Sequence, residues 1–256
     1  MNIVVCVKLT PDAEDIEVRP DGSISLDKAE WTIGPYDLQA IETAVKLVET
    51  AGGKVIALSA GPVQINNSKL KKDLLSRGPD ELCLIVDDRL RDADTSATST
   101  VLAAAITKIG AVDLVLCGEG SADLYFQQVG LQLGERLGWP TLNSISKVEA
   151  QGSQLRVERS LEDEVAILDV PTPAALSVTT DINTPRLPSM KMILMASKKP
   201  VTEWSLTELG VQPENQVELV STKAPRKAAR KQVRISGSPE EAVAALVGYL
   251  SKEGAL

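Results

Sequence analysis

The chain has 256 residues, enough for one large domain or two small ones, and its net charge of −8 disfavours nonspecific nucleic-acid binding. It contains no histidine, which excludes a histidine general base, a Ser–His–Asp triad and histidine metal ligands. Cys6, Cys83 and Cys117 stand far apart in apolar runs without a C-x-x-C spacing, which disfavours zinc and iron–sulfur sites and fits a reducing compartment.

The N-terminus has no basic region before an apolar stretch, and no apolar run reaches the roughly 20 residues that span a bilayer. We therefore expect a cytoplasmic protein that does not insert into membranes, does not bind nucleic acid and holds no metal.

The first half of the chain alternates strand-like and helix-like segments. Apolar runs predict buried strands at residues 2–9, 54–59, 81–86 and 113–117. Helical periodicity predicts helices at residues 35–50, 68–76, 96–109 and 124–137. The pair Asp21-Gly22 predicts a hairpin over residues 16–27. Such alternation indicates right-handed crossovers and a parallel sheet covered by helices.

After Pro140 the pattern changes, because short strands follow one another without helices between them. They lie at residues 144–148, 154–159, 165–170 and 174–178, and we expect them to form an antiparallel extension of the sheet.

The C-terminal segment has its own composition. Residues 223–234 hold six basic residues and no acid, which favours a solvated linker over a contact with an acidic partner. Ser238, Pro239, Glu240 and Glu241 then predict the start of a final amphipathic helix. We expect a domain at residues 1–220 and a linker with a helical arm at residues 221–256.

Two strand-to-helix junctions carry candidate ligand groups. Residues 118–123 read Gly-Glu-Gly-Ser-Ala-Asp, where glycines let the backbone approach a ligand before a helix begins. Residues 94–98 read Asp-Thr-Ser-Ala-Thr, which either cap a helix or gather hydroxyls around a pyrophosphate. Ligands of open α/β sheets lie beyond the carboxyl ends of the strands, so the two junctions together favour a nucleotide site.

Residues 181–200 combine Pro185 and Pro188 with an apolar stretch that holds three of the four methionines. The prolines exclude a buried strand. One turn of core helix is one interpretation of Met190–Met195, and an adaptable docking surface is the other, because methionine repacks easily.

These motifs resemble the β subunits of electron transfer flavoproteins, and the resemblance covers residues 1–211. Its marks are V-K-L-x-P-D at residues 7–12, G-E-G-S-A-D-L-Y-F-Q-Q-V-G at residues 118–130 and D-x-N-x-P-R at residues 181–186. The likeness is closest to the FixA branch, whose members are associated with carnitine metabolism. The fold implied is a three-layer α/β sandwich with a mostly parallel sheet, Rossmann-like and of the adenine-nucleotide-binding type, with a C-terminal arm on the partner subunit.

The resemblance implies an electron carrier rather than an enzyme, with no catalytic residue of its own. The chain would pair with a FixB-like α subunit, share its FAD, and carry electrons between an acyl-CoA dehydrogenase-type flavoenzyme and a quinone oxidoreductase or ferredoxin-like protein. Its own site would hold AMP or a second FAD, and D-T-x-A-T at residues 94–98 resembles the members that hold FAD. The implied cofactor contacts are Cys6, Gly34, Pro35, Tyr36, Asp37, Ala60, Asp94, Thr95, Thr98, Gly118, Glu119, Gly120, Ser121, Ala122, Asp123, Gln127, Gln128 and Val129.

The same resemblance makes residues 186–195 a recognition loop for the dehydrogenase, with Leu187 as its anchor. The implied partner contacts are Leu187, Met190, Met192, Ile193 and Leu194. The alternative function is an adenine-nucleotide-binding regulatory protein with a universal-stress or ATP-pyrophosphatase-like fold. A methionine-rich docking loop and a C-terminal arm favour the electron carrier, because a self-contained nucleotide sensor needs neither.

Overall fold

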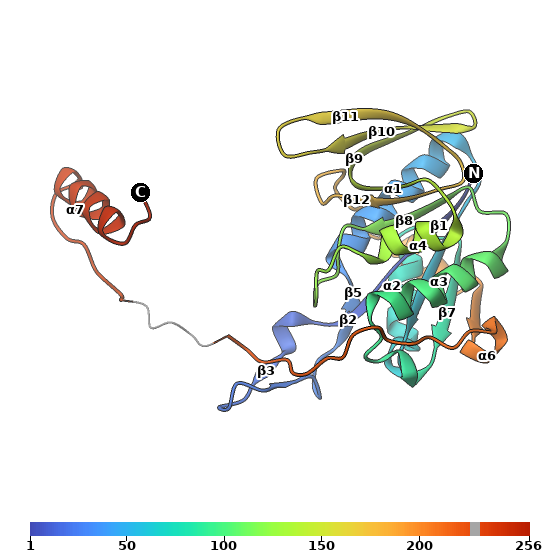
Figure 1. The fold of residues 1–256 in the computed structure, drawn as a ribbon, viewed down its shortest axis with the longest axis horizontal. Helices are drawn as coiled ribbons and strands as arrows, with labels where there is room; N and C mark the ends of the chain where they lie inside the picture. The colour runs from blue at the N-terminus through green and yellow to red at the C-terminus, as the bar shows by residue number, and fades with distance from the viewer. Residues whose placement is uncertain (226–230) are drawn as a thin grey trace.

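The main element of the fold is one sheet of nine strands, in the order β11-β10-β9-β12-β8-β1-β6-β7-β13 (Figure 1). The computed structural model describes residues 1–225 and 231–256. The four strands predicted in the first half of the chain lie side by side and run parallel: β1 (Asn2–Cys6), β6 (Lys54–Gly61), β7 (Glu81–Val86) and β8 (Leu114–Gly118). The predicted parallel α/β sheet is therefore confirmed.

The second half of the chain extends the sheet at both edges. The strands are β9 (Thr141–Gln151), β10 (Gln154–Ser160), β11 (Val165–Pro171), β12 (Ala174–Val178) and β13 (Val201–Trp204). Strands β9, β10 and β11 pair antiparallel, as predicted.

The strand predicted at residues 174–178 is confirmed, but its predicted antiparallel pairing is wrong, because β12 runs parallel to both β8 and β9. All five residues of β12 are buried, which matches the continuous apolar run of a parallel strand covered on both faces. Strand β13 was not predicted; it pairs parallel with β7 at the far edge.

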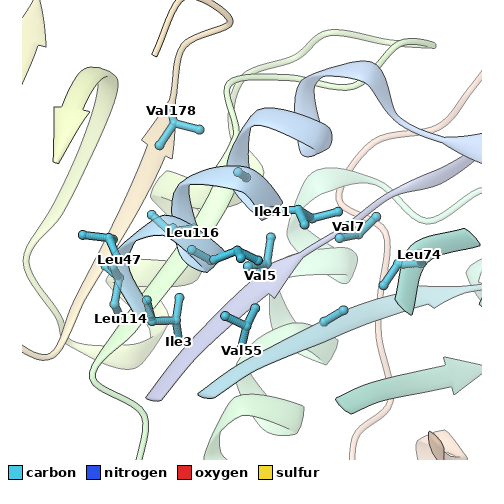
Figure 2. Close-up of a cluster of buried hydrophobic side chains, with 14 of the residues drawn as sticks. Ile3, Val5, Val7, Ile41, Leu47, Val55, Leu74, Leu114, Leu116 and Val178 are labelled. Carbon is cyan, nitrogen blue, oxygen red and sulfur yellow. The ribbon is translucent and has the colours of Figure 1, made fainter. Parts of the chain in front are cut away.

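Helices cover both faces of the sheet and complete three layers. On one face lie α1 (Pro35–Ala51), α2 (Ser68–Ser76) and α5 (Met190–Ala196); on the other lie α3 (Thr95–Ile109), α4 (Val129–Leu137) and α6 (Leu206–Leu209). Each face of the sheet has its own hydrophobic core. Alternate residues of β1 pack into one core or the other, because successive strand side chains point to opposite faces. Figure 2 shows Ile3 and Val5 of β1 beside Ile41 of α1, whereas Val4 belongs to the core under α3.

The chain between β1 and α1 forms two small antiparallel pairs. Strand β2 (Leu9–Pro11) pairs with β5 (Trp31–Ile33), and β3 (Glu17–Val18) pairs with β4 (Ile24–Ser25) in the predicted hairpin. Short 3₁₀ turns lie at Ala13–Asp15, Val63–Ile65 and Asp88–Leu90. The predicted strand at residues 2–9 is thus divided, because the Lys8 amide donates to Asp37 instead of to a neighbouring strand.

The helix predicted at residues 124–137 begins five residues later, at Val129. Tyr125 and Gln127 adopt positive φ values of 50° and 57°, which no α-helix accommodates. Residues 119–128 therefore form a loop over the end of β8. Helix α3 and the strands at Lys54 and Glu81 begin within one residue of the predicted positions.

Helix α4 approaches the sheet closely at two glycines one turn apart. A Cβ added to Gly130 would collide with the Ser177 hydroxyl, and one added to Gly134 would collide with the Thr141 side chain. Both neighbours lie on strands, β12 and β9, that cannot withdraw without disturbing the ladder.

We expect Gly134→Ala to lower the free energy of unfolding by about 1 to 3 kcal/mol, because overpacking against Thr141 outweighs the gain in helix propensity. Gly248→Ala is the matched control: Gly248 is also helical, but a Cβ there meets nothing within 4 Å. Urea unfolding measures the free energy of unfolding of both variants. Equal values for the two variants would contradict the close approach of α4 to the sheet.

The C-terminal helix α7 (Pro239–Lys252) begins with the predicted cap, in which Ser238 and Glu241 each bind the other's backbone amide. Figure 1 draws α7 apart from the three layers, and none of its residues is buried. Of the predicted basic linker, residues 226–230 lie outside the described residues. Within the described part of the chain, no helix is long and apolar enough to cross a membrane.

Candidate functional site

The candidate site lies where parallel strands end and helices begin. Cys6, at the end of β1, is paired with Leu58 of β6 on one side and with Cys117 of β8 on the other. Because these strands run parallel, the turns that follow them meet at one edge of the sheet. The first turns of α1, α3 and α4 also lie there, and a helix N-terminus presents free amides to an anion.

Asp37, in the first turn of α1, links this helix to the ends of two strands by hydrogen bonds. Its Oδ2 accepts a hydrogen bond of 2.7 Å from the Lys8 backbone amide, and its side chain also accepts from the Gly118 amide. Only 5% of Asp37 is exposed. Burial raises the pKa of Asp37 to about 7, although the two backbone amides favour the charged form. One carboxyl group thus joins the ends of β1 and β8 to α1.

Glycine at two positions lets these segments approach. A Cβ on Gly118 would lie 2.7 Å from the carbonyl carbon of Tyr36 and 2.8 Å from Asp37 Oδ1. A Cβ on Gly34 would lie 2.8 Å from Asp37 Oδ2. Each space is too small for any side chain, so the backbone itself lines this part of the edge.

The loop at residues 119–128 is held over the edge by a charged and an aromatic contact. The Lys8 ammonium binds both carboxylate oxygens of Asp123, at 2.8 and 2.6 Å. Burial opposes ionisation of Asp123, but the Lys8 ammonium outweighs it and keeps the pKa of Asp123 below its ordinary value. The rings of Tyr36 and Tyr125 lie 5.1 Å apart at 42°, a favourable tilted geometry.

The start of α3 joins the same edge through a polar network. The Thr95 hydroxyl donates to Gln128 Oε1 at 3.0 Å, and Gln132 Nε2 of α4 donates to Thr95 at 3.1 Å. These contacts bring the two junctions predicted from the sequence together. Hydroxyl and amide groups of this kind are suitable donors for a phosphate or a ribose.

Asp94 faces a different part of the chain. It caps α3 by accepting from the Ala97 amide at 2.7 Å, and it also accepts from the amides of Gln216 and Val217 at 2.5 and 3.1 Å. Burial raises the pKa of Asp94, but its backbone hydrogen bonds outweigh burial and hold the pKa below its ordinary value. Asp94 therefore caps α3, as one interpretation of residues 94–98 predicted. Its carboxylate also connects the segment after α6 to α3.

The structure brings most of the predicted cofactor residues to one edge. Those joined by the contacts above are Cys6, Gly34, Tyr36, Asp37, Gly118, Asp123, Thr95 and Gln128. Pro35 opens α1, Glu119, Gly120, Ser121, Ala122 and Gln127 belong to the loop, and Val129 begins α4. Ala60 pairs with Ile85 in the neighbouring strands β6 and β7, and the amide of Thr98 binds the Asp94 carbonyl inside α3.

Sequence reasoning missed Lys8, Tyr125 and Gln132 as members of this cluster. Lys8 is the first charged residue after the apolar run of β1, a signal that could have identified it. Tyr125 and Gln132 carry no such signal, because their contacts depend on where the loop and α4 lie.

Cys6 and Cys117 are buried side by side on adjacent strands. A hydrogen bond with Cys117 and burial raise the pKa of Cys6 well above its ordinary value, so this thiol is neutral near pH 7. Its role at the edge is therefore to pack rather than to act as a nucleophile.

The predicted partner-binding residues lie on α5 and in the segment directly before it. The helix of the first interpretation is present at Met190–Ala196, but it is not a core helix, because only Ala196 is buried; docking stays a prediction. Leu187 is 89% exposed, Met190 73% and Leu194 63%, while Met192 and Ile193 are half-buried. The segment therefore presents an apolar surface, defined here as Leu187–Met195 and called the docking surface below.

A sequence model of the electron transfer flavoprotein domain matches residues 22–209, which include α1 to α6, the loop at residues 119–128 and the docking surface. Members of this family are electron carriers that bind FAD. The match covers well over half of the chain and agrees with the three-layer fold described above. The chain therefore belongs to the electron transfer flavoprotein family.

Proposed function

We propose that this chain is the β subunit of a heterodimeric electron transfer flavoprotein of the FixA branch. The observation that carries the proposal is the helix α7 at the end of a chain of this family. Its apolar residues recur at helical spacing on one face, and all are exposed: Val243 61%, Leu246 47%, Val247 48% and Leu250 36%.

A helix of 14 residues is only marginally stable alone in water, so α7 needs a surface on which to bury this face. We assign that surface to a FixB-like α subunit. Residues 1–220 are then the nucleotide-binding domain, and residues 221–256 are the linker and arm that hold the partner.

The strand-edge site would hold an adenine nucleotide, either AMP or the second FAD of the complex. The residues present fit such a group: Gly118 leaves the backbone open to close approach, and Thr95 and Gln128 supply polar groups, while the Lys8 ammonium is bound by Asp123. The carboxylate of Asp94 is already bound by three backbone amides, so Thr95 rather than Asp94 is the better ligand on α3.

The principal FAD would lie between the two subunits and supply the redox chemistry, by accepting and releasing electrons. This chain would orient the nucleotide and exclude water from it. The docking surface would receive an acyl-CoA dehydrogenase-type flavoenzyme, such as one of a carnitine pathway, and a quinone- or ferredoxin-linked protein would exchange electrons with the same complex. Both steps would take place in the cytoplasm.

The experiment that tests this function is to express the chain together with a candidate α subunit, purify the complex, and count FAD and AMP after denaturation. One FAD with one AMP is the result expected of a simple electron shuttle. Two FAD without AMP would assign the strand-edge site to flavin and make electron bifurcation the mechanism. A chain that forms no complex and holds no flavin would contradict the proposed role.

A further inference from the structure

The docking surface is held at both ends by polar contacts, most of them partly buried. The chain leaves the carboxyl end of β12 at Val178, crosses the face formed by α1 and α2, and returns to the sheet at β13. Between these points it displays large apolar side chains to solvent, and α5 has only seven residues. A helix of this length is not stable alone, so its shape depends on what fixes its ends.

Arg186, the residue directly before Leu187, holds the N-terminal end of the docking surface. We call it the first clamp. Its guanidinium group binds Glu42 through Nε at 2.7 Å and through Nη2 at 3.1 Å, and it binds Glu49 through Nη1 at 2.6 Å. The Arg186 backbone amide also donates to Glu42 Oε2 at 3.1 Å. Glu42 and Glu49 lie two helical turns apart on α1, so one side chain spans both. These two carboxylates raise the pKa of Arg186 above its ordinary value.

Asn183 supports the same end of the segment. Its side-chain amide donates to the Gln39 carbonyl at 3.0 Å and to the Thr43 hydroxyl at 2.7 Å, both on α1. Because Glu42 is only 4% exposed, its side of the ion pair with Arg186 is shielded from solvent.

The second clamp is Lys199, three residues after the end of α5. Its ammonium group donates to the carbonyls of Leu75 and Pro79 at 2.9 and 2.6 Å, and it reaches the Gly78 carbonyl at 3.4 Å. These carbonyls lie at the C-terminal end of α2, where the helix dipole favours a cation. Lys198, its neighbour, is exposed, and its side chain makes no hydrogen bond or ion pair with the described residues.

Together the clamps fix the segment so that Ala196 packs into the core while Leu187 and Met190 face outward. We propose that Arg186 and Lys199 are positioning residues that pre-organise the docking surface for an acyl-CoA dehydrogenase-type partner, a role that rests on the proposed function. An ordered surface binds more tightly, because less conformational entropy is lost when the partner arrives.

The test compares Arg186→Gln and Lys199→Met, each in the complex with the α subunit. Lys198→Met is the matched control for hydrogen exchange, and Val220→Ala, which lies outside the docking surface, is the control for the KM. Hydrogen exchange of the amides at residues 190–196 is measured first. We expect it to rise about tenfold in the two clamp variants and to stay unchanged in the control, since an unclamped helix opens more often. Unchanged exchange in both clamp variants would overturn the proposal.

The second readout separates positioning from general damage. With an acyl-CoA dehydrogenase as electron donor, the KM for the complex should rise about fivefold or more in the clamp variants, while kcat and FAD content stay near wild type. A fall in kcat and FAD content without a change in KM would show a merely structural role. If even the wild-type complex accepts no electrons from the dehydrogenase, the proposed function fails, while the exchange data still decide whether the clamps order the surface.

Because Arg186→Gln leaves Glu42 buried without its main partner, it could fail to fold. Glu49→Gln is the milder variant, since Glu49 is half-exposed and its loss removes only one side of the clamp. We expect exchange of residues 190–196 to rise two- to threefold in Glu49→Gln. Arg186→Lys should restore little, because an ammonium group cannot bind two separated carboxylates at once.

Discussion

Raising the pH from about 5 to about 8 will lower the free energy of unfolding of this chain by roughly 2 to 3 kcal/mol, and Asp37 will be the main cause. Burial raises the pKa of Asp37 from 3.8 to about 7 in the folded chain. Between these two values the folded state binds a proton that the unfolded state has released. The contribution of Asp37 to stability is therefore fully present below the lower pKa and is lost as the pH rises through the upper one.

The absence of histidine makes this window favourable for the measurement, because no imidazole titrates in it. Urea unfolding of the isolated chain at several pH values gives the slope, and Asp37→Asn is the control that removes the titrating group. We expect a nearly flat profile for Asp37→Asn between about pH 5 and 8. A wild-type slope that persists in Asp37→Asn would assign the effect to another group.

Asp37→Asn should also weaken the strand-edge site. A carboxylate accepts from both the Lys8 and the Gly118 amides, whereas an asparagine side chain has only one oxygen for two donors. One buried amide then loses its partner, which costs about 1 to 3 kcal/mol. Nucleotide retained per complex, counted after denaturation, should fall in this variant even at a pH where the chain stays folded.

Leu187→Ala should weaken docking of the dehydrogenase by about 2 kcal/mol, which is roughly a 30-fold rise in KM for the complex. Leu187 is 89% exposed, so truncation removes partner contacts without creating a cavity in this chain. The temperature of unfolding should accordingly stay the same. Steady-state reduction of the complex by an acyl-CoA dehydrogenase measures the effect.

Two variants control this result. Val220 is equally exposed, at 88%, but lies outside the docking surface, so Val220→Ala should leave the KM unchanged. Lys198→Ala should act on the association rate and its salt dependence, because exposed charges steer encounter more than they hold a complex. Leu187→Ala running at the wild-type rate would refute the anchor assignment.

The sequence predicted the centre of the sheet well, because its signals are local. Helix α2 has the predicted bounds, since its apolar pattern is followed by Gly78-Pro79. Strand β7 also has the predicted bounds, since its apolar run is followed by the acidic residues Asp87 and Asp88. The family match confirms the electron transfer flavoprotein family, and its range includes the motifs around Gly118 and Arg186.

Other features depend on contacts between distant segments, so the local sequence pattern does not predict them. Strand β13 is largely exposed at an edge, so it lacks the apolar run of the central strands. The direction of β12 depends on where it inserts, between β8 and β9. The start of α4 is delayed because the preceding loop contacts Lys8 and Tyr36, residues more than eighty positions away.

By itself, the sequence determined that this is an α/β chain with polar groups at strand ends, a methionine-rich apolar segment and a capped C-terminal helix, because hydrophobic periodicity and turn chemistry are properties of neighbouring residues. Only the tertiary structure decided which charges are structural. Asp94 serves a cap, and Lys199 holds three carbonyls while Lys198 stays exposed. The physical reason is that a charge acquires its role from burial and from its partners, and both are set by segments that the fold brings together from far along the chain.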